Sequence, residues 1–234
     1  MALKRSQLRV TVNDRFGWVL LATILTYSVI VAFDSAQWNG LAGAVPILVT
    51  VVLVINASTP SSGIRTTALT SAGLALVVGA VGALLGHESI VQGVSELLGG
   101  LAIGVCIIAT LIRMASHATV SVNTVFAVLS AYVMFGLFFT FIDSGIGHIA
   151  GQFFAQPGPH TQSDYAYLSY ITLTTVGFGD LTPGTGLARS SIIFEALVGQ
   201  IFLVTLVARI VSLMGTQRSP IQLSEGIELG DDQE

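Results

Sequence analysis

The chain has 234 residues, of which 53% are hydrophobic and only 9% are charged. Soluble domains carry charge at roughly 25% of positions, so this composition excludes an ordinary soluble protein and favours one embedded in a bilayer. The net charge of −4 is divided between a basic start and an acidic end, and no basic patch indicates a nucleic-acid partner.

Six apolar segments predict membrane-spanning helices, at residues 16–33, 41–56, 67–86, 94–113, 122–142 and 189–214. A helix rises about 1.5 Å per residue and needs roughly 17 to 25 residues to cross the hydrocarbon. The first segment is too long for the apolar part of a cleaved signal, so we interpret it as a retained span. The second is the shortest, with Pro46 near its start, where a first helical turn tolerates proline. We predict an all-α integral membrane protein.

Two features of the first four segments bear on their role. Small residues at four-residue spacing, Gly82 with Gly86 and Gly100 with Gly104, predict close packing between helices. A voltage sensor presents several arginines along its fourth helix, whereas residues 94–112 contain none. We therefore expect that this four-helix domain does not sense voltage.

The distribution of lysine and arginine predicts that both termini face the cytoplasm. Loops 34–40 and 87–93 contain no basic residue, whereas basic residues precede the first segment and recur at Arg65, Arg113, Arg209 and Arg218. The positive-inside rule places the basic segments in the cytoplasm of a multi-pass protein of the cell membrane. The predicted divisions are a cytoplasmic segment at 1–15, a four-helix domain at 16–113, a second membrane domain at 122–214 and an acidic cytoplasmic tail at 215–234.

The region between the fifth and sixth segments then lies outside. Residues 143–163 are polar and glycine-rich and predict an outer loop. Ser163 or Asp164 can cap a short helix that runs to about Thr174, too short to cross the membrane and therefore re-entrant. Asp143 and Asp164 either concentrate cations at the outer mouth or serve as an ordinary helix end and cap.

The stretch Thr-Leu-Thr-Thr-Val-Gly-Phe-Gly-Asp at residues 172–180 follows this short helix. Gly177 and Gly179 alternate with Val176 and Phe178, and glycine enters left-handed backbone conformations at little cost. Successive carbonyls can therefore point to one side, where they can replace the hydration shell of an ion. The stretch resembles the selectivity filter of the potassium-channel pore-domain family, with Phe178 in place of the usual tyrosine.

This resemblance implies a potassium-selective channel that conducts passively, with residues 122–214 as its pore domain. The filter would comprise residues 175–180, and K⁺ would be bound by the carbonyls of Thr175, Val176, Gly177 and Phe178. Because each chain offers one filter segment and four are needed, the resemblance also implies a homotetramer within membrane lipids. We expect no organic cofactor, no soluble partner and no enzymatic activity.

The resemblance assigns supporting roles to residues on either side of the filter. Asp180 would brace the filter from behind through a hydrogen bond from Tyr167, with Thr174 as a second support. In the sixth segment, Gly199 either forms the hinge that the family commonly has there or merely admits a neighbouring helix. The same helical register directs three side chains toward a water-filled cavity: Gln200, Leu203 and Val207.

Glu195 lies inside the sixth segment, where an ionisable residue is costly. The register turns it away from the pore, so we favour a structural role with a hydrogen-bonded or protonated carboxylate. The single cysteine, Cys106, lies in an apolar run and is interpreted as a buried structural thiol.

Two alternatives stay open. Phe178 lacks a hydroxyl to brace the filter, which leaves room for a non-selective monovalent cation channel. Residues 177–180 also match the Gly-x-Gly-Asp of intramembrane aspartyl proteases, in which Asp180 would share a proton with a second acid such as Asp143. That motif belongs in a spanning helix, whereas Pro183 and Gly184 follow closely here, so the protease is the less favoured alternative.

Overall fold

The computed structural model describes residues 15–32, 39–85, 89–115 and 122–215. These residues form α1 (Arg15–Ala32), α2 (Asn39–Ser58), α3 (Ser62–Leu85), α4 (Ser89–Ala115), α5 (Val122–Ala150), α6 (Gln162–Leu173) and α7 (Gly186–Gly215). The only strand-like pairing in these ranges is an isolated bridge between Phe154 and Pro183. The prediction of an all-α protein is confirmed.

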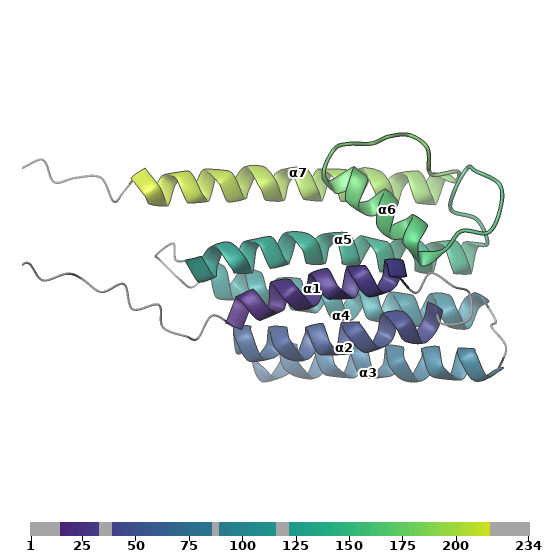
Figure 1. The fold of residues 1–234 in the computed structure, drawn as a ribbon, viewed down its shortest axis with the longest axis horizontal. Coiled ribbons are helices and arrows are strands. Elements are labelled where there is room, and N and C mark those ends of the chain that lie inside the picture. The colour runs from purple at the N-terminus through teal and green to yellow at the C-terminus, as the bar shows by residue number, and fades with distance from the viewer. Residues whose placement is uncertain (1–14, 33–38, 86–88, 116–121, 216–234) are drawn as a thin grey trace, which may run out of the picture.

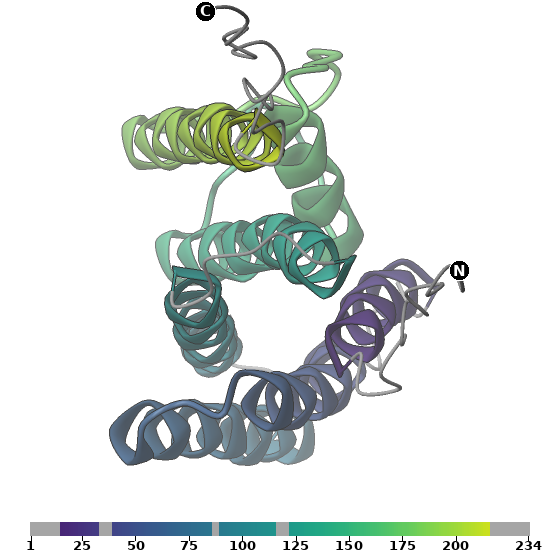
Figure 2. The same ribbon diagram turned by 90° about the vertical axis from the view of Figure 1, so that its left-hand side faces the viewer.

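The helices are arranged around α5, which lies between α7 and the bundle of α1 to α4 (Figures 1 and 2). On one side α5 packs against α4 and α1, and on the other it contacts α6 and α7. The short helix α6 lies beside the half of α5 and α7 where α5 ends and α7 begins (Figure 1). The start of α1 and the end of α7 lie at the opposite end of the molecule.

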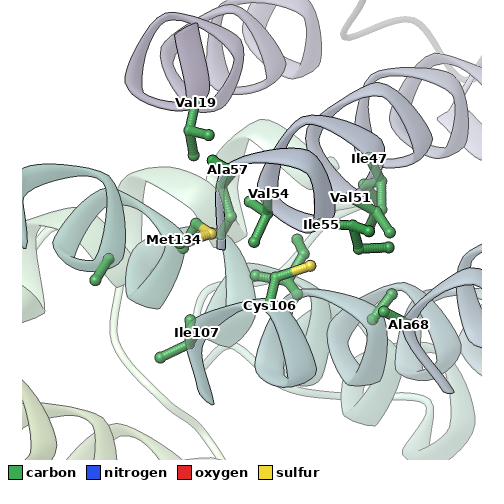
Figure 3. Close-up of a cluster of buried hydrophobic side chains, with 14 of the residues drawn as sticks. Val19, Ile47, Val51, Val54, Ile55, Ala57, Ala68, Cys106, Ile107 and Met134 are labelled. Atoms are coloured by element: carbon green, nitrogen blue, oxygen red, sulfur yellow. The ribbon is translucent and has the colours of Figure 1, made fainter. Parts of the chain in front are cut away.

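The core is a continuous apolar cluster in which the first four helices meet α5 (Figure 3). Val19 from α1, Val54 from α2, Ala68 from α3, Cys106 from α4 and Met134 from α5 are all buried in it. Cys106 is a free, buried thiol, as the sequence indicated. Helices α1 to α4 therefore share one apolar core with α5.

Four helices are long and apolar enough to cross a membrane within the described ranges: Ser62–Leu84, Ser89–Ala115, Asn123–Ala150 and Gly186–Ala208. The corresponding apolar parts of α1 and α2 are shorter, Phe16–Ala32 and Val45–Ser58. Residues of α2 before Val45 are helical as well, and the whole helix has 20 residues. The six-span layout stays a prediction.

Two details of the predicted elements are wrong. Pro46 lies inside α2, which begins at Asn39, and not in its first turn. A proline there removes one helical N–H, and a membrane helix tolerates this because neighbouring groups bond the freed backbone. Near this point the Thr26 hydroxyl of α1 lies 3.4 Å from the Pro46 carbonyl and 3.0 Å from the Thr50 hydroxyl.

The outer loop is also shorter than predicted, because α5 continues to Ala150 and the segment up to α6 begins at Gly151. The polar residues of this extension are not solvated. Asp143 and Ser144 are buried, and His148 lies 3.0 Å from Glu96 of α4. Partners on other helices thus make a polar stretch helical that by composition alone predicts a loop.

The glycines of α4 allow close helix packing, as predicted. A Cβ on Gly100 would lie 3.0 Å from the Ile142 side chain, and one on Gly104 would lie 3.0 Å from Phe138, both on α5. Gly82 faces Val91 in the same way, at 3.2 Å. Its predicted companion Gly86 lies outside the described residues, as do residues 1–14 and 216–234 of the two predicted cytoplasmic segments.

Candidate functional site

The short helix α6 begins two residues earlier than the predicted cap at Ser163 would allow. Thr161 is its N-cap, and the Thr161 N–H donates to the Asp164 carboxylate over 3.1 Å. His160 lies 3.2 Å from the same carboxylate and 3.0 Å from the carbonyl of Gln156. Asp164 therefore accepts the N–H of the N-cap residue Thr161, and Ser163 does not cap the helix.

Three hydroxyl groups tie α6 to α5. Tyr132 donates to the Leu173 carbonyl over 2.9 Å, and Tyr170 donates to the Val133 carbonyl over 2.8 Å. Ser169 lies 2.9 Å from the Gly136 carbonyl. Gly136 is required there because a Cβ would collide with the Tyr170 ring. These contacts fix the depth and direction of α6, and the sequence analysis identified none of them.

The backbone conformation is no longer helical after α6 ends. Thr175, Gly177 and Gly179 have positive φ angles of 59°, 50° and 78°, whereas the residues between them do not. The N–H groups of Val176 and Gly177 both donate to the Ile171 carbonyl, over 2.9 and 3.1 Å. Left-handed and ordinary residues thus alternate along residues 175–179, a pattern that lets successive carbonyls share one side.

A single chain leaves this segment uncovered. Every residue from Thr174 to Asp180 is exposed, and the apolar side chains are no exception, with Val176 at 52% and Phe178 at 71%. By contrast, α6 immediately before it is largely buried, including Leu168, Ile171 and Leu173. The segment is held from one side by α6 and is open on the other.

Tyr167 and Asp180 form the bond that the resemblance implies. The Tyr167 hydroxyl donates to the Asp180 carboxylate over 2.8 Å, and this bond lowers the pKa of Asp180. The same bond is the main reason that the pKa of Tyr167 is raised. Phe178 lies nearly parallel to the Tyr167 ring, at 4° with centroids 6.5 Å apart, so it sits beside the bond without contributing to it. Thr174 caps α6, and its hydroxyl donates to the Tyr170 carbonyl over 2.6 Å.

Gln156 holds the far end of the segment, a role that the sequence pattern did not predict. Its amide nitrogen donates to the Asp180 carbonyl over 2.8 Å, and its amide oxygen accepts the Thr182 N–H over 3.1 Å. Gly184 follows, where a Cβ would lie only 2.7 Å from the Phe154 carbonyl oxygen. A glutamine in a polar loop gives no local signal, because its partners lie more than twenty residues away.

Two residues one turn apart on α7, Ser191 and Glu195, each take part in a hydrogen bond that involves a buried carboxyl group. Ser191 donates to the Asp143 carboxylate of α5, and Glu195 is hydrogen-bonded to Ser169 of α6. Asp143 and Glu195 are both fully buried. The prediction that the Glu195 carboxyl is hydrogen-bonded is confirmed, and its structural role stays a prediction, whereas Asp143 is buried and bonded to Ser191.

Gly199 lies one turn after Glu195 and packs on α6. A Cβ at this position would lie 2.5 Å from the Leu173 side chain, so close approach of α7 to α6 explains the glycine. The three predicted cavity residues follow on α7. Gln200 and Val207 are exposed in the single chain and Leu203 is half-buried.

Residues 126–216 match a protein-family model described as an ion channel. Comparisons with curated proteins and with solved structures found no match. The matched residues run from α5 through α6 and the 175–180 segment to α7, so the match supports an ion-channel pore in this part of a membrane-embedded protein. It also favours a non-enzymatic, transporter-type protein.

The ion-channel region does not bring together the acids that a protease would use. Asp180 is exposed and bonded to Tyr167, whereas Asp143 is buried and bonded to Ser191. No contact between the two carboxyls occurs in the described part of the chain. A shared proton requires two acids in contact, so this arrangement does not support the aspartyl-protease alternative.

Arg113 lies in the last turn of α4, at the helix end where the sequence placed it. Its guanidinium donates to the Thr59 hydroxyl over 3.3 Å. Tyr27 of α1 contacts the ring of Tyr170 edge to face, with centroids 4.9 Å apart. Helix α1 therefore contacts α6 itself.

Proposed function

We propose that the protein is a potassium-selective channel that conducts passively through a homotetrameric pore, with residues 175–180 as its selectivity filter. The observation that carries the proposal is the alternation of left-handed residues at Thr175, Gly177 and Gly179, directly after a short helix in an ion-channel region. Four such segments around one axis would surround dehydrated K⁺ with the carbonyls of Thr175, Val176, Gly177 and Phe178.

The filter's exposure supports assembly from four copies. Irregular backbone at membrane depth is tolerated only where protein surrounds it or where it lines water. In one chain, residues 174–180 have protein on one side only. Other copies would enclose the segment on its remaining sides and leave a water-filled axis for the ion.

The outer surface of α7 supports the same assembly. Most of this helix is uncovered by its own chain, and many of its exposed side chains are apolar, including Ile193, Phe194, Leu197 and Ile201. We propose that part of this face meets neighbouring copies and part meets lipid. Gln200, Leu203 and Val207 would then line the cavity on the inner side of the filter, and both termini would lie in the cytoplasm of a cell-membrane protein.

The test is reconstitution of the purified protein in planar bilayers. Under opposed potassium and sodium gradients, the reversal potential should lie near the potassium equilibrium potential. A reversal potential near zero would instead identify the non-selective cation channel that Phe178 leaves open. The protease alternative is tested by a peptide-cleavage assay. The unmodified protein and Asp143→Asn should both show no more cleavage than empty vesicles.

A further inference from the structure

Three helices of the ion-channel region meet at one buried hydroxyl. Ser169 of α6 and Glu195 of α7 are both 0% exposed. The Ser169 oxygen lies 2.9 Å from the Gly136 carbonyl of α5 and within hydrogen-bond distance of a Glu195 carboxyl oxygen. The other Glu195 oxygen has no hydrogen-bond partner.

The Gly136 carbonyl also accepts from the Thr140 hydroxyl over 2.7 Å, so the Ser169 contacts are decided by the protons that Ser169 and Glu195 themselves carry. A serine hydroxyl has one proton, and a backbone carbonyl can only accept. If Glu195 were ionised, Ser169 would face two acceptors with a single proton, and one of the two buried contacts would lack a donor. If Glu195 is protonated, its O–H donates to Ser169, whose own proton is free for the Gly136 carbonyl.

The charges around Glu195 lead to the same conclusion. Among the basic side chains that the structure describes, none lies within 4.0 Å of its carboxyl group. The nearby titratable groups are Asp143 on α5, which is itself an acid, and Tyr170 on α6, whose hydroxyl donates to Val133. A buried carboxylate without a counter-charge is costly, whereas a neutral acid in a hydrogen-bond chain is not.

We propose that Glu195 is held as a neutral carboxylic acid at the head of a relay in which Glu195 donates to Ser169 and Ser169 donates to the Gly136 carbonyl. The relay makes Glu195 a positioning residue for the filter. Glu195 and Gly199 are one turn apart on α7, and they contact Ser169 and Leu173, which are one turn apart on α6. Leu173 is the last residue of the helix that carries the filter.

Infrared spectroscopy of the reconstituted protein tests the protonation state without relying on ion flux. The wild-type protein should show the carbonyl stretch of a protonated carboxylic acid at neutral pH, and this band should be lost in Glu195→Gln. Replacing Ser169 by alanine should shift the band, because its hydrogen-bond acceptor is removed. Ser191→Ala is the matched control, since it removes a half-buried hydroxyl bonded to the other acid of the same region, Asp143, and it should leave the Glu195 band in place.

Isotope labelling covers the case in which a variant does not fold. Glutamate labelled with ¹³C at the side-chain carboxyl should lower the frequency of the band in the unmodified sequence, which assigns it to glutamate and not to Asp143. The proposal would be overturned if labelling left the frequency of the band unchanged. It would also be overturned if no protonated-acid band could be assigned to Glu195.

The consequence for the filter rests on the proposed channel function and is tested separately. Glu195→Ala should lower the open probability about tenfold, as expected for one lost buried hydrogen bond, whereas Glu195→Gln should retain most of it because an amide N–H can still donate to Ser169. Equal loss in both variants would contradict the positioning role. Loss of potassium selectivity in the unmodified protein would instead contradict the channel proposal and leave the infrared result unaffected.

Discussion

Gly177 and Gly179 occupy left-handed backbone conformations with free space around their Cα atoms, since a Cβ would meet nothing within 4 Å. Alanine at either position is therefore penalised by the backbone alone, at about 1 to 2 kcal/mol per residue. In a tetramer that penalty is repeated four times around one axis. Gly177→Ala and Gly179→Ala should abolish potassium-selective current in bilayer recordings.

Gly151 provides a matched control for this experiment. Its φ of 77° is nearly that of Gly179, and its surroundings are equally open, but it lies in the loop after α5. Gly151→Ala should therefore lower thermal stability by a similar amount and leave the reversal potential unchanged. A filter variant that kept the potassium reversal potential would show that residues 175–180 do not select the ion.

We expect the hydrogen bond from Tyr167 to Asp180 to make the proposed filter resistant to acid. Its hydrogen bond lowers the pKa of Asp180, so the stabilisation from ionised Asp180 is present above the ordinary aspartate pKa and is lost only as the pH falls through the lowered value. In Tyr167→Phe the Asp180 pKa should return toward its ordinary value of 3.8. Single-channel current measured against external pH should then fail at a higher pH than in the unmodified protein.

A control distinguishes the lost hydroxyl from a lost ring. Phe178→Tyr adds a hydroxyl next to the same ring pair and leaves the bond between Tyr167 and Asp180 in place. It should not raise the pH at which current fails. Identical acid profiles for Tyr167→Phe and the unmodified channel would show that this bond does not brace the conducting filter.

At the scale of elements, the contact between α7 and α6 depends on Gly199. A methyl group there would lie 2.5 Å from the Leu173 side chain, which is itself buried, so alanine forces Leu173 out of its rotamer. Overpacking of this kind costs about 1 to 3 kcal/mol. Gly199→Ala should lower the melting temperature in detergent, and adding Leu173→Ala should restore part of the loss.

Gly186, at the start of the same helix, is the control because a Cβ there meets nothing within 4 Å. Gly186→Ala should leave the melting temperature nearly unchanged. If Gly199→Ala instead altered channel opening with no change in stability, and Leu173→Ala did not compensate, the glycine would be a hinge and not a packing site.

At the scale of the whole molecule, one chain contributes one segment 175–180, the proposed filter, and leaves it exposed. Four chains of 24.4 kDa are therefore expected to assemble around a common axis. Native mass spectrometry in mild detergent should give a mass four times that of the chain. A conducting preparation that contained only monomers or dimers would reject the tetramer.

The voltage response is also a property of the whole molecule. Moving one charge through the entire membrane field yields about 2.3 kcal/mol per 100 mV, so steep gating needs three or four charges in each subunit. Arg113 is a single charge at the end of α4, with its guanidinium bonded to Thr59. Conductance recorded over a range of voltages should change gradually. A tenfold rise over about 20 mV would require gating charges that the described helices do not carry.

Local composition was enough to determine much of this protein. The long apolar stretches predicted the helical membrane fold, because lipid leaves a spanning backbone few ways to satisfy its hydrogen bonds. The glycine alternation at 177 and 179 indicated the left-handed conformations found there, since that preference belongs to the residue itself. The absence of arginines in residues 94–112 is likewise a fact of sequence alone.

Tertiary structure decided the features that depend on partners distant in the chain. Asp143 lies in a polar stretch that predicted a loop, but Ser191 and close helix packing make that stretch helical and buried. Gln156 holds Asp180 and Thr182 through an amide group that is ordinary in any loop. Glu195 could be recognised from sequence as a costly group, whereas its donor role depends on Ser169 having a second acceptor on α5. Backbone conformation is a local property, but the satisfaction of buried polar groups depends on which helices fold against each other.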